Sequence, residues 1–562
     1  MTEGISRSRL RVLFALFAVA TLLLSLRVGY WQTIGRSALL DGATDQTRSD
    51  LVIEAQRGVI RDRSGAILAT TVDLRSLYAI PKRILEADRA AVAAKLAPLI
   101  ATPAPTILAA LNSGAEWLYL KRRLPEPVAR AVEALSIPGL GFEPEPKRLY
   151  PNDALAAHVL GFVNDDGVGQ YGVEGAYDKV LRGVPGRLIV ERDPKDRELA
   201  LGLRTAVSPK NGADLVLTID LVVQTAAEQA LRRAIEREKA PSGSIIVLDP
   251  RDGAILALAS WPTFDPSRIA AADPLSLQDR AVSWTFEPGS TMKAVTIAAG
   301  IDKHVVTPTT TYEDKGCTVI GGRRLCNAQG KVYGTTTVTQ ILERSANAGA
   351  VFVASKLGQD PLYQYLRAFG FGDPTGIDLA AEASGAVRPL AEWYPVDVGT
   401  VAYGQGIAVT PLQLAMAYAA IANGGTLYRP YVVAATRDAE GEHRTAPVAI
   451  RSPIGADTAD TLRTMLVSTV DKGIAHGASL PGYSVGGKTG TAQIPSDDGR
   501  YVDDAYISSF AGFVPANDPR FAVVVVLERP QTKLLGTVTA MQTFHDLAID
   551  VLRNARVQPD RP

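Results

Sequence analysis

The chain has 562 residues, of which 46% are hydrophobic and 21% charged, and its 59 acidic residues balance its 59 basic ones. This composition is typical of folded domains and, at about 150 residues per domain, leaves room for about three to four of them. A formal net charge of zero provides no general attraction for nucleic acid, so no such partner is expected. With two cysteines, five histidines and no H-E-x-x-H pattern, the sequence predicts neither a metal site nor a cofactor.

The first predicted element is an apolar helix near the N-terminus. Three arginines precede the uncharged run Val12–Leu26, which spans about 22 Å as a helix, and extension to Trp31 gives about 30 Å, the thickness of a membrane's hydrocarbon core. Arg27 can then reach the far interface along its flexible stem. Because positive residues mark the cytoplasmic side, we predict a cytoplasmic tail, 1–11, and a transmembrane signal anchor, 12–31.

A cleaved signal peptide is the alternative. Ala18–Ala20 fits the small-residue pattern of a cleavage site, but only the short apolar run Val12–Phe17 precedes it and apolar residues continue after it. Cleavage normally follows about 7–15 apolar residues, which favours an uncleaved anchor. The later apolar run Phe521–Leu527 has only the length of a strand. We therefore predict a single-pass membrane protein with almost all of the chain outside the cytoplasm.

Residues 37–210 form a predicted pedestal domain with mixed strand and helix signals. Leu51–Ile60 is predicted to be extended, and the alanine-rich, amphipathic segment Arg83–Ile100 to be a helix that ends before Pro103. Pro127–Leu135 is a second helix candidate. The sequence of this region shows no catalytic constellation.

Residues 211–556 form a second predicted module, followed by a short tail, 557–562. Strands are predicted at both of its ends, with helices between them, which indicates an α+β fold. The predicted strands are Asp214–Ile219, Ser244–Leu248, Ala254–Ala259, Ile507–Val514 and Phe521–Leu527, and the flanking helices are Leu221–Arg237 and Thr543–Arg553.

The first motif with catalytic chemistry is Ser290-Thr291-Met292-Lys293, at the start of an apolar helical stretch. The spacing puts Ser290 and Lys293 on one helical face, with the serine at the helix N-terminus, where free N–H groups favour negative charge. A neutral lysine can act as the base for a serine nucleophile, but this requires its pKa to fall by roughly 3–4 units through burial and a nearby positive charge. Taken alone, the motif also fits a surface serine and lysine.

The two cysteines flank a predicted hairpin. If Gly321 and Gly322 form a two-residue turn, Cys317 lies opposite Cys326 in a non-hydrogen-bonded pair, with Cα atoms about 4.5 Å apart. This distance suits a disulfide. We predict the disulfide Cys317–Cys326 in an oxidising compartment, with two reduced thiols as the alternative.

The second motif is Ser345-Ala346-Asn347, between the helix-like segments Val338–Glu343 and Ala348–Lys356. A serine and an amide at this place could relay a proton and hold a peptide carbonyl. A bare S-x-N is common, and alone it would most often be a capped turn.

The third motif, Lys488-Thr489-Gly490-Thr491, reads as an extended edge strand. Gly490 would let a substrate backbone approach and pair as an added strand. Lys488 and the two threonine hydroxyls suit a carboxylate, and the N–H group of Thr491 suits an oxyanion hole.

A competing pattern overlaps the third motif. Residues 482–489 satisfy G-x-x-x-x-G-K-[ST], the phosphate-binding loop. That loop must follow a buried strand and open a helix. Here the preceding Gly473–Pro481 is polar, and Pro495 and Gly499 follow, so the nucleotide-binding interpretation is disfavoured.

The ordered series S-x-x-K, S-x-N and K-T-G resembles the penicillin-binding protein and serine β-lactamase superfamily. Arg57-Gly58, Arg148-Leu-Tyr150-Pro151 and Gly172-Val-Glu174-Gly175 resemble pedestal motifs of its class B, and Tyr403-Gly404-Gln405-Gly406 agrees as well. Asparagine at 347 and a single anchor resemble the septal (FtsI-type) peptidoglycan D,D-transpeptidases. One departure is Leu534–Phe544, which lacks the glycine-rich segment and Ala-Pro-x-Phe pattern usual in that type.

The resemblance implies a five-stranded antiparallel sheet flanked by helices, with an all-helical subdomain, as in serine β-lactamases. It implies that Ser290 attacks a D-Ala-D-Ala stem peptide while Lys293 takes the proton, and that the N–H groups of Ser290 and Thr491 hold the oxyanion. Ser345 would pass a proton to the leaving D-Ala and Asn347 would orient the acyl chain. Lys488 would supply electrostatic stabilisation. Thr489 and Thr491, with Gly490 between them, would bind the substrate, the two threonines through its terminal carboxylate.

The implied setting is the bacterial inner membrane, where an amine from a second stem peptide attacks the acyl-enzyme to form a cross-link. β-Lactam antibiotics would bind the same site. The implied protein partners are a membrane-embedded glycan polymerase of the SEDS (FtsW-like) type and other division proteins. The alternatives are an elongation-type transpeptidase, a division scaffold with a silent transpeptidase domain, and a membrane-bound β-lactamase, which the absence of Glu-x-x-Leu-Asn between the second and third motifs disfavours.

Overall fold

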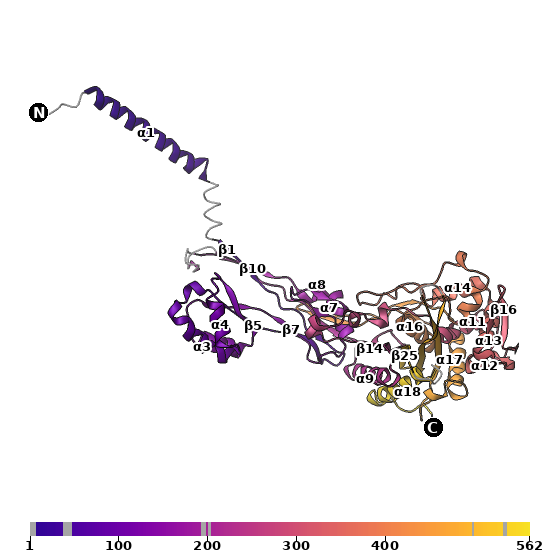
Figure 1. Cartoon of the computed structure of the whole chain (residues 1–562). Helices are drawn as coiled ribbons and strands as arrows, with labels where there is room; N and C mark the ends of the chain where they lie inside the picture. Colours follow the sequence, from indigo (N-terminus) through magenta and orange to yellow (C-terminus); the bar gives the residue numbers. More distant parts are fainter. Residues whose placement is uncertain are drawn as a thin grey trace. The chain divides into compact units, whose positions relative to one another are not determined.

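The computed structural model describes residues 7–36, 48–192, 198–199, 204–496, 500–531 and 537–561 (Figure 1). Three predicted segments lie partly outside the described residues: the tail (1–6), the pedestal (37–47, 193–197 and 200–203) and the segment Leu534–Phe544 that departs from the family pattern (534–536). The chain divides into two compact units. One comprises Met1–Gln56 with Gly183–Gly212, and the other comprises Arg57–Arg182 with Ala213–Pro562.

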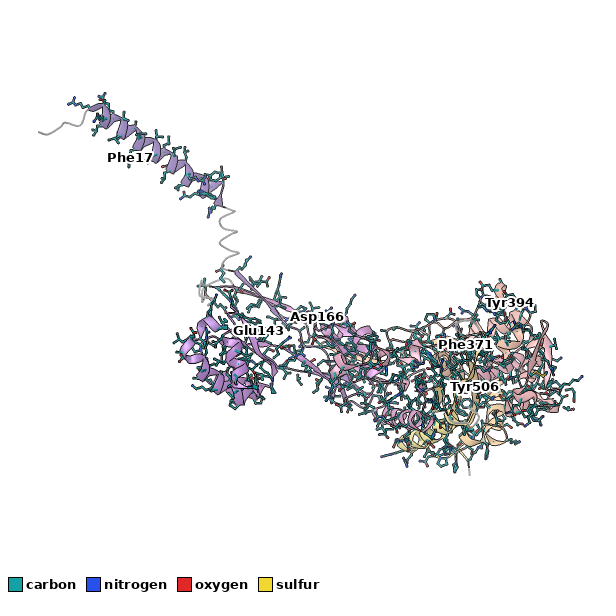
Figure 2. The ribbon with its side chains drawn as sticks, viewed as in Figure 1. Phe17, Glu143, Asp166, Phe371, Tyr394 and Tyr506 are labelled. Atoms are coloured by element: carbon teal, nitrogen blue, oxygen red, sulfur yellow. A yellow bond between two sulfur atoms is a disulfide. The ribbon has the colours of Figure 1, made fainter. Side chains whose placement is uncertain are left out.

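The first unit contains a long apolar helix and a three-stranded antiparallel sheet. Helix α1 (Arg7–Thr33) has a mean hydropathy of 2.2 and no buried side chain, and Figure 2 shows Phe17 projecting from it. By length and composition α1 can cross a membrane, and it contains the predicted span. In the sheet, β10 (Gly186–Glu191) lies between β1 (Arg48–Ile53) and β11 (Arg204–Val207).

A small α+β layer occupies residues 75–144 of the second unit. Strand β4 (Arg75–Ala79) lies between β5 (Leu118–Leu124) and β6 (Leu140–Pro144). Helices α3 (Arg89–Ile100), α4 (Ala104–Leu111) and α5 (Glu126–Glu133) share its hydrophobic core. The helix predicted from Arg83 starts at Arg89, because two short 3-10 turns, Pro81–Arg83 and Glu86–Asp88, come first.

A six-stranded mixed sheet joins early and late parts of the second unit, in the order β21-β20-β12-β2-β3-β7. Its early strands are β2 (Ile60–Arg61), β3 (Ile67–Val72) and β7 (Lys147–Leu149). Its later strands are β12 (Asp214–Leu217), β20 (Val433–Asp438) and β21 (Gly441–Arg444). Because β2 pairs directly with β12, residues more than a hundred positions apart share one sheet.

The central sheet is five-stranded and antiparallel throughout, as the resemblance implies, in the order β14-β13-β25-β24-β23. Four of its strands correspond to predicted ones: β13 (Ser242–Leu248), β14 (Ile255–Trp261), β24 (Tyr501–Val514) and β25 (Phe521–Glu528). The fifth, β23 (Gly486–Pro495), is the edge strand that carries the third motif.

Alternate residues of β25 point to opposite faces of this sheet, which is why the strand reads as a continuous apolar run. Val523 and Val525 belong to the core shared with α9 (Leu221–Glu238) and α18 (Thr537–Asn554). Val524 and Val526 belong to the larger core that includes α11 (Lys293–Asp302) and α16 (Pro411–Ala422). The sheet therefore lies between two helical layers.

A mainly helical region packs beside the sheet and carries the second motif. It contains α11 together with α12 (Val338–Arg344), α13 (Asn347–Leu357), α14 (Gln359–Ala368) and α15 (Asp397–Ala402). Two small two-stranded sheets are inserted in it, β15 (Thr311–Asp314) with β18 (Gly334–Thr337), and β16 (Cys317–Ile320) with β17 (Arg323–Cys326).

Candidate active site

Ser290 lies on a tight turn at the start of a buried helix. The turn, Gly289–Met292, is a 3-10 helix that continues directly into α11, whose residues from Lys293 to Ile301 are all buried. Ser290 itself is only partly buried. The serine therefore sits one turn before the α-helix proper, while Lys293 is its first residue and is fully buried.

The first two motifs meet at the Lys293 amine. Its Nζ lies 3.0 Å from Ser290 Oγ, 2.7 Å from the Ser345 carbonyl oxygen and 2.7 Å from Asn347 Oδ1. Ser345 Oγ is a fourth neighbour, at 3.1 Å. All four contacts are with uncharged oxygens.

The second motif forms the junction between α12 and α13. Ser345 follows the last turn of α12 with φ of 56°, a left-handed conformation that a residue other than glycine adopts at some cost. The bond from the Ala346 N–H to the Ile341 carbonyl closes this turn. Asn347 then begins α13, so both polar side chains reach Lys293.

The third motif brings a second lysine to the same place. Lys488 is fully buried on β23, and its Nζ lies 3.0 Å from Ser345 Oγ and 3.0 Å from the Thr489 carbonyl oxygen. Ser345 Oγ is thus shared by two amines. Because β23 is extended, with Lys488 buried inside it, residues 482–489 do not form the strand-to-helix loop that a phosphate-binding site requires.

Burial shifts both amines toward the neutral form, and the positive charge of Lys488 adds to the shift of Lys293. Burial and the positive charge of Lys488 hold the pKa of Lys293 well below its ordinary value. Burial lowers the pKa of Lys488 to about 7. Both effects favour the neutral form of the Lys293 amine, which is the form that can accept a proton.

Gly490 has a structural role that the sequence did not indicate. A side chain there would meet Ser509 Oγ at 2.2 Å and the Pro288 carbonyl oxygen at 3.0 Å. The absent side chain lets β23 pack against the nucleophile turn. The predicted approach of a substrate backbone at Gly490 stays a prediction. On the same strand Thr489 is fully buried, and Thr491 Oγ1 is shielded from solvent without a hydrogen-bond partner in the described parts of the chain.

Several residues that support the nucleophile turn were not predicted as site residues. The Gly289 N–H donates to the Gly404 carbonyl oxygen (3.1 Å), and Tyr418 donates to the Thr291 carbonyl oxygen (2.9 Å). Glu287 accepts from the Gly406 N–H (2.7 Å) and from the Tyr501 hydroxyl (3.0 Å), and burial raises its pKa. The Tyr403–Gly406 motif was the signal in the sequence that could have identified this support.

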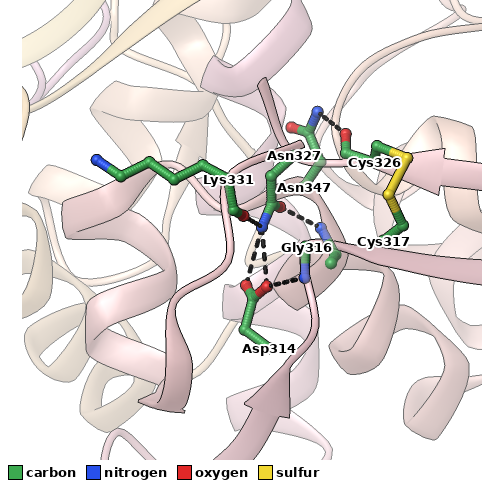
Figure 3. The surroundings of a disulfide bond; sticks show 8 residues. Asp314, Gly316, Cys317, Cys326, Asn327, Lys331 and Asn347 are labelled. Atoms are coloured by element: carbon green, nitrogen blue, oxygen red, sulfur yellow. Dashed lines mark hydrogen bonds between the residues drawn. A yellow bond between two sulfur atoms is a disulfide. The ribbon is translucent and has the colours of Figure 1, made fainter. Parts of the chain in front are cut away.

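The predicted disulfide is present. Cys317 is bonded to Cys326, with Cα atoms 4.0 Å apart (Figure 3). Ile320 pairs with Arg323 around the predicted glycine turn. The hairpin register counted outward from Gly321 and Gly322 is therefore confirmed. No group of three potential metal ligands of the types His, Cys, Asp and Glu occurs in the described ranges.

Two family profiles match most of the chain. Residues 243–548 match the penicillin binding protein transpeptidase domain, and residues 52–217 match the penicillin-binding protein dimerisation domain. These two matches include all three motifs and most of the predicted pedestal.

Individual relatives are similar over nearly the full length. Stage V sporulation protein D of Bacillus subtilis is 34% identical, covering 98% of this chain and 86% of the relative. Peptidoglycan D,D-transpeptidase FtsI of Escherichia coli is 30% identical, covering 95% of this chain and 90% of the relative. The crystal structure of penicillin binding protein 3 from Mycobacterium tuberculosis complexed with aztreonam superposes with a TM-score of 0.72 at 28% identity, covering 91% of this chain and 99% of that one.

The contact between Ser290 and a buried lysine with a lowered pKa agrees with the two domain matches and with the relatives. The chain belongs to the class B penicillin-binding proteins and is a serine-type peptidoglycan D,D-transpeptidase.

Proposed function

We propose that Ser290 is the nucleophile and Lys293 its base in the cross-linking of D-Ala-D-Ala stem peptides. The observation that carries this assignment is the set of contacts around Nζ. A neutral amine has two N–H groups and one lone pair. The Ser345 carbonyl and Asn347 Oδ1, which only accept, take the two N–H groups. The lone pair is left for a hydroxyl, which we assign to Ser290 at 3.0 Å, with Ser345 Oγ at 3.1 Å as the second hydroxyl neighbour.

The backbone N–H groups of Ser290 and Thr491 form the oxyanion hole in this proposal. A side chain on Gly289 would lie 3.0 Å from the Thr491 carbonyl oxygen, so this carbonyl faces the nucleophile turn. In an antiparallel strand the N–H and C=O of one residue point the same way. The Thr491 N–H is therefore directed toward the turn, where it would stabilise the tetrahedral intermediate.

Ser345 and the two lysines complete the acyl transfer. As the Ser290 Oγ–carbon bond forms and the peptide C–N bond breaks, Ser345 Oγ passes the proton from Lys293 to the departing D-Ala nitrogen. Asn347 orients the acyl chain, and Lys488 with the Thr489 and Thr491 hydroxyls holds the terminal carboxylate. An amine of a second stem peptide then forms the new C–N bond as the ester bond to Ser290 Oγ breaks, and the proton that the amine loses returns to Ser290.

The test is covalent labelling with a fluorescent penicillin. We expect the wild-type chain to be labelled and Ser290→Ala to lose labelling completely, because the ester oxygen is gone. Ser113→Ala, at an exposed position on another part of the chain, is the matched control and should label normally. Equal labelling of Ser290→Ala and wild type would refute the assignment. Continuous turnover of the penicillin would instead indicate a β-lactamase.

We propose the division septum as the place of action. The basis is asparagine at 347 and the finding of one helix of membrane-spanning length and hydropathy among the described residues. The relatives include both a sporulation protein and FtsI. Depletion should give filamentous cells. Round cells would indicate an elongation enzyme, and a defect confined to spores would indicate a sporulation role. Survival of cells on Ser290→Ala alone would favour a silent scaffold.

The proposed topology is an uncleaved anchor with the catalytic domain outside the cytoplasm. The division into a pedestal, 37–210, and a transpeptidase domain, 211–556, belongs to this proposal, as does contact of the pedestal and anchor with an FtsW-like polymerase. Intact-mass measurement of the membrane-extracted protein should give the full-length mass of 59.7 kDa. A mass reduced by about twenty residues would show cleavage after the Ala18–Ala20 pattern.

A further inference from the structure

The disulfide-closed hairpin lies directly against the second motif. The Asn347 amide donates from Nδ2 to the Cys326 carbonyl oxygen at 2.9 Å, and Figure 3 shows this bond next to the sulfur bridge. The same amide presents Oδ1 to Lys293 at 2.7 Å. A residue of the disulfide and the base of the reaction are therefore linked through one side chain.

A second contact fixes the same end of the hairpin. Asn327 Oδ1 accepts from the Ala348 N–H at 2.9 Å, and its Nδ2 donates to both Asp314 carboxylate oxygens, at 2.9 and 3.0 Å. Asn327 and Asp314 are both buried. The hairpin thus holds the side chain of Asn347 and the backbone of the next residue, at the first turn of α13.

The orientation of the Asn347 amide decides what the Lys293 lone pair can do. An amide accepts hydrogen bonds at its oxygen and donates them at its nitrogen. A half-turn of this amide would bring Nδ2 to the Lys293 amine, whose lone pair would then accept from Asn347 and no longer from Ser290. The same half-turn would place Oδ1 against the Cys326 carbonyl, and two acceptors in contact repel each other.

We propose that the Cys326 carbonyl, kept in place by the Cys317–Cys326 disulfide, is a positioning group for the acylation step. It holds the Asn347 amide with its oxygen toward Lys293, so the lone pair of the base stays directed at Ser290. One N–H of Nδ2 is used by Cys326, and the other remains for the acyl chain. This inference rests on the proposed roles of Ser290 and Lys293.

The experiment opens the hairpin and measures acylation by a fluorescent penicillin in stopped flow, resolving the binding constant K from the acylation rate constant k2. Full-length protein in detergent is used as the oxidised wild type, as Cys317→Ser/Cys326→Ser, and as wild type reduced with dithiothreitol. Arg324→Gln, an exposed change on the same hairpin, is the matched control. Circular dichroism establishes which samples are folded.

We expect k2 to fall about tenfold in both open-hairpin samples, as is typical when a positioning hydrogen bond is lost, with K changed less than twofold. Arg324→Gln should keep both constants. If the double variant does not fold, the acylation rate constant k2 of the reduced wild type tests the inference. If that sample unfolds too, Asn327→Ala, which keeps the disulfide and removes the second contact, should lower k2 in the same selective way.

Two results would overturn the inference. Unchanged k2 in a folded, open-hairpin protein would show that the carbonyl does not position the base. A change confined to K would indicate that the hairpin only shapes the binding cleft. An oxidised wild type that takes no label at all would instead refute the proposed function, so the two failures are distinguishable.

Discussion

Two buried lysines within reach of one serine hydroxyl define the chemistry at the scale of single residues. Lys293 and Lys488 both contact Ser345 Oγ, and neither has an acidic partner at its Nζ among the contacts of the described chain. The pKa of each is lowered by burial, that of Lys293 further by the charge of Lys488. One amine can then serve as base while the other retains positive charge for the substrate carboxylate.

The pH dependence of acylation should report the charge of Lys488. Its pKa of about 7 means that the amine is charged below that pH and loses its charge as the pH rises. We expect k2/K for penicillin to decline on the alkaline side of about pH 7 in wild type. Lys488→Arg, which stays charged throughout this range, should lack the alkaline decline even if its maximum is lower. The measurement is k2/K from pH 5 to 10, and the same decline in both proteins would contradict this role for Lys488.

At the scale of elements, the nucleophile turn is shaped by the loop that packs on it. Gly404 has φ of 84°, and a side chain there would meet the Gly289 carbonyl oxygen at 2.2 Å and its nitrogen at 2.6 Å. Local propensity explains α9 and α18 well, because their apolar spacing is periodic. It does not explain the position of Ser290, which depends on backbone contacts with residues more than a hundred positions away.

Gly404→Ala should therefore impair acylation, although the added methyl group does not contact the substrate. The added methyl group must displace the Gly289 backbone, and the left-handed conformation adds a cost of about 1–2 kcal/mol. We expect k2 to fall by about a hundredfold or more, since a small displacement of a nucleophile is costly. Gly424→Ala, at φ of 88° with open space around it, controls for backbone strain alone. If both variants acylate alike, packing on the nucleophile turn is not the reason for glycine at 404.

At the scale of the whole molecule, a buried ion network ties separate parts of the second unit together. Glu174 is fully buried and accepts from Arg57 Nε at 2.8 Å and from Arg148 Nε at 2.7 Å. Arg148 also donates to the Gly58 carbonyl oxygen at 2.8 Å. The pedestal motifs that contain Arg57, Arg148 and Glu174 are separate in the sequence. In the structure they meet at the Glu174 carboxylate.

Removing that carboxylate should strongly destabilise the fold. Glu174→Ala leaves two guanidinium groups buried without their shared partner, at a cost of about 3–5 kcal/mol. Glu116→Ala removes an ion pair with Lys82 in which both side chains are exposed, and should cost less than about 1 kcal/mol. Urea unfolding followed by circular dichroism measures both. A similar, small shift of the midpoint in the two variants would contradict the structural role of the network.

The sequence by itself determined the apolar helix, the α+β class, the three motifs and the cysteine register. These features follow from local rules, such as the short apolar run that predicts β25 and the outward count from the Gly321-Gly322 turn. That count predicted Cys317 opposite Cys326, and the structure confirms the pairing. Only the tertiary structure decided that Lys488 reaches Ser345, 143 positions away, that Gly490 packs closely against the nucleophile turn, and that Cys326 accepts from Asn347. The reason is physical: burial, pKa shifts and amide orientation depend on which distant segments come into contact, and local periodicity carries no information about that.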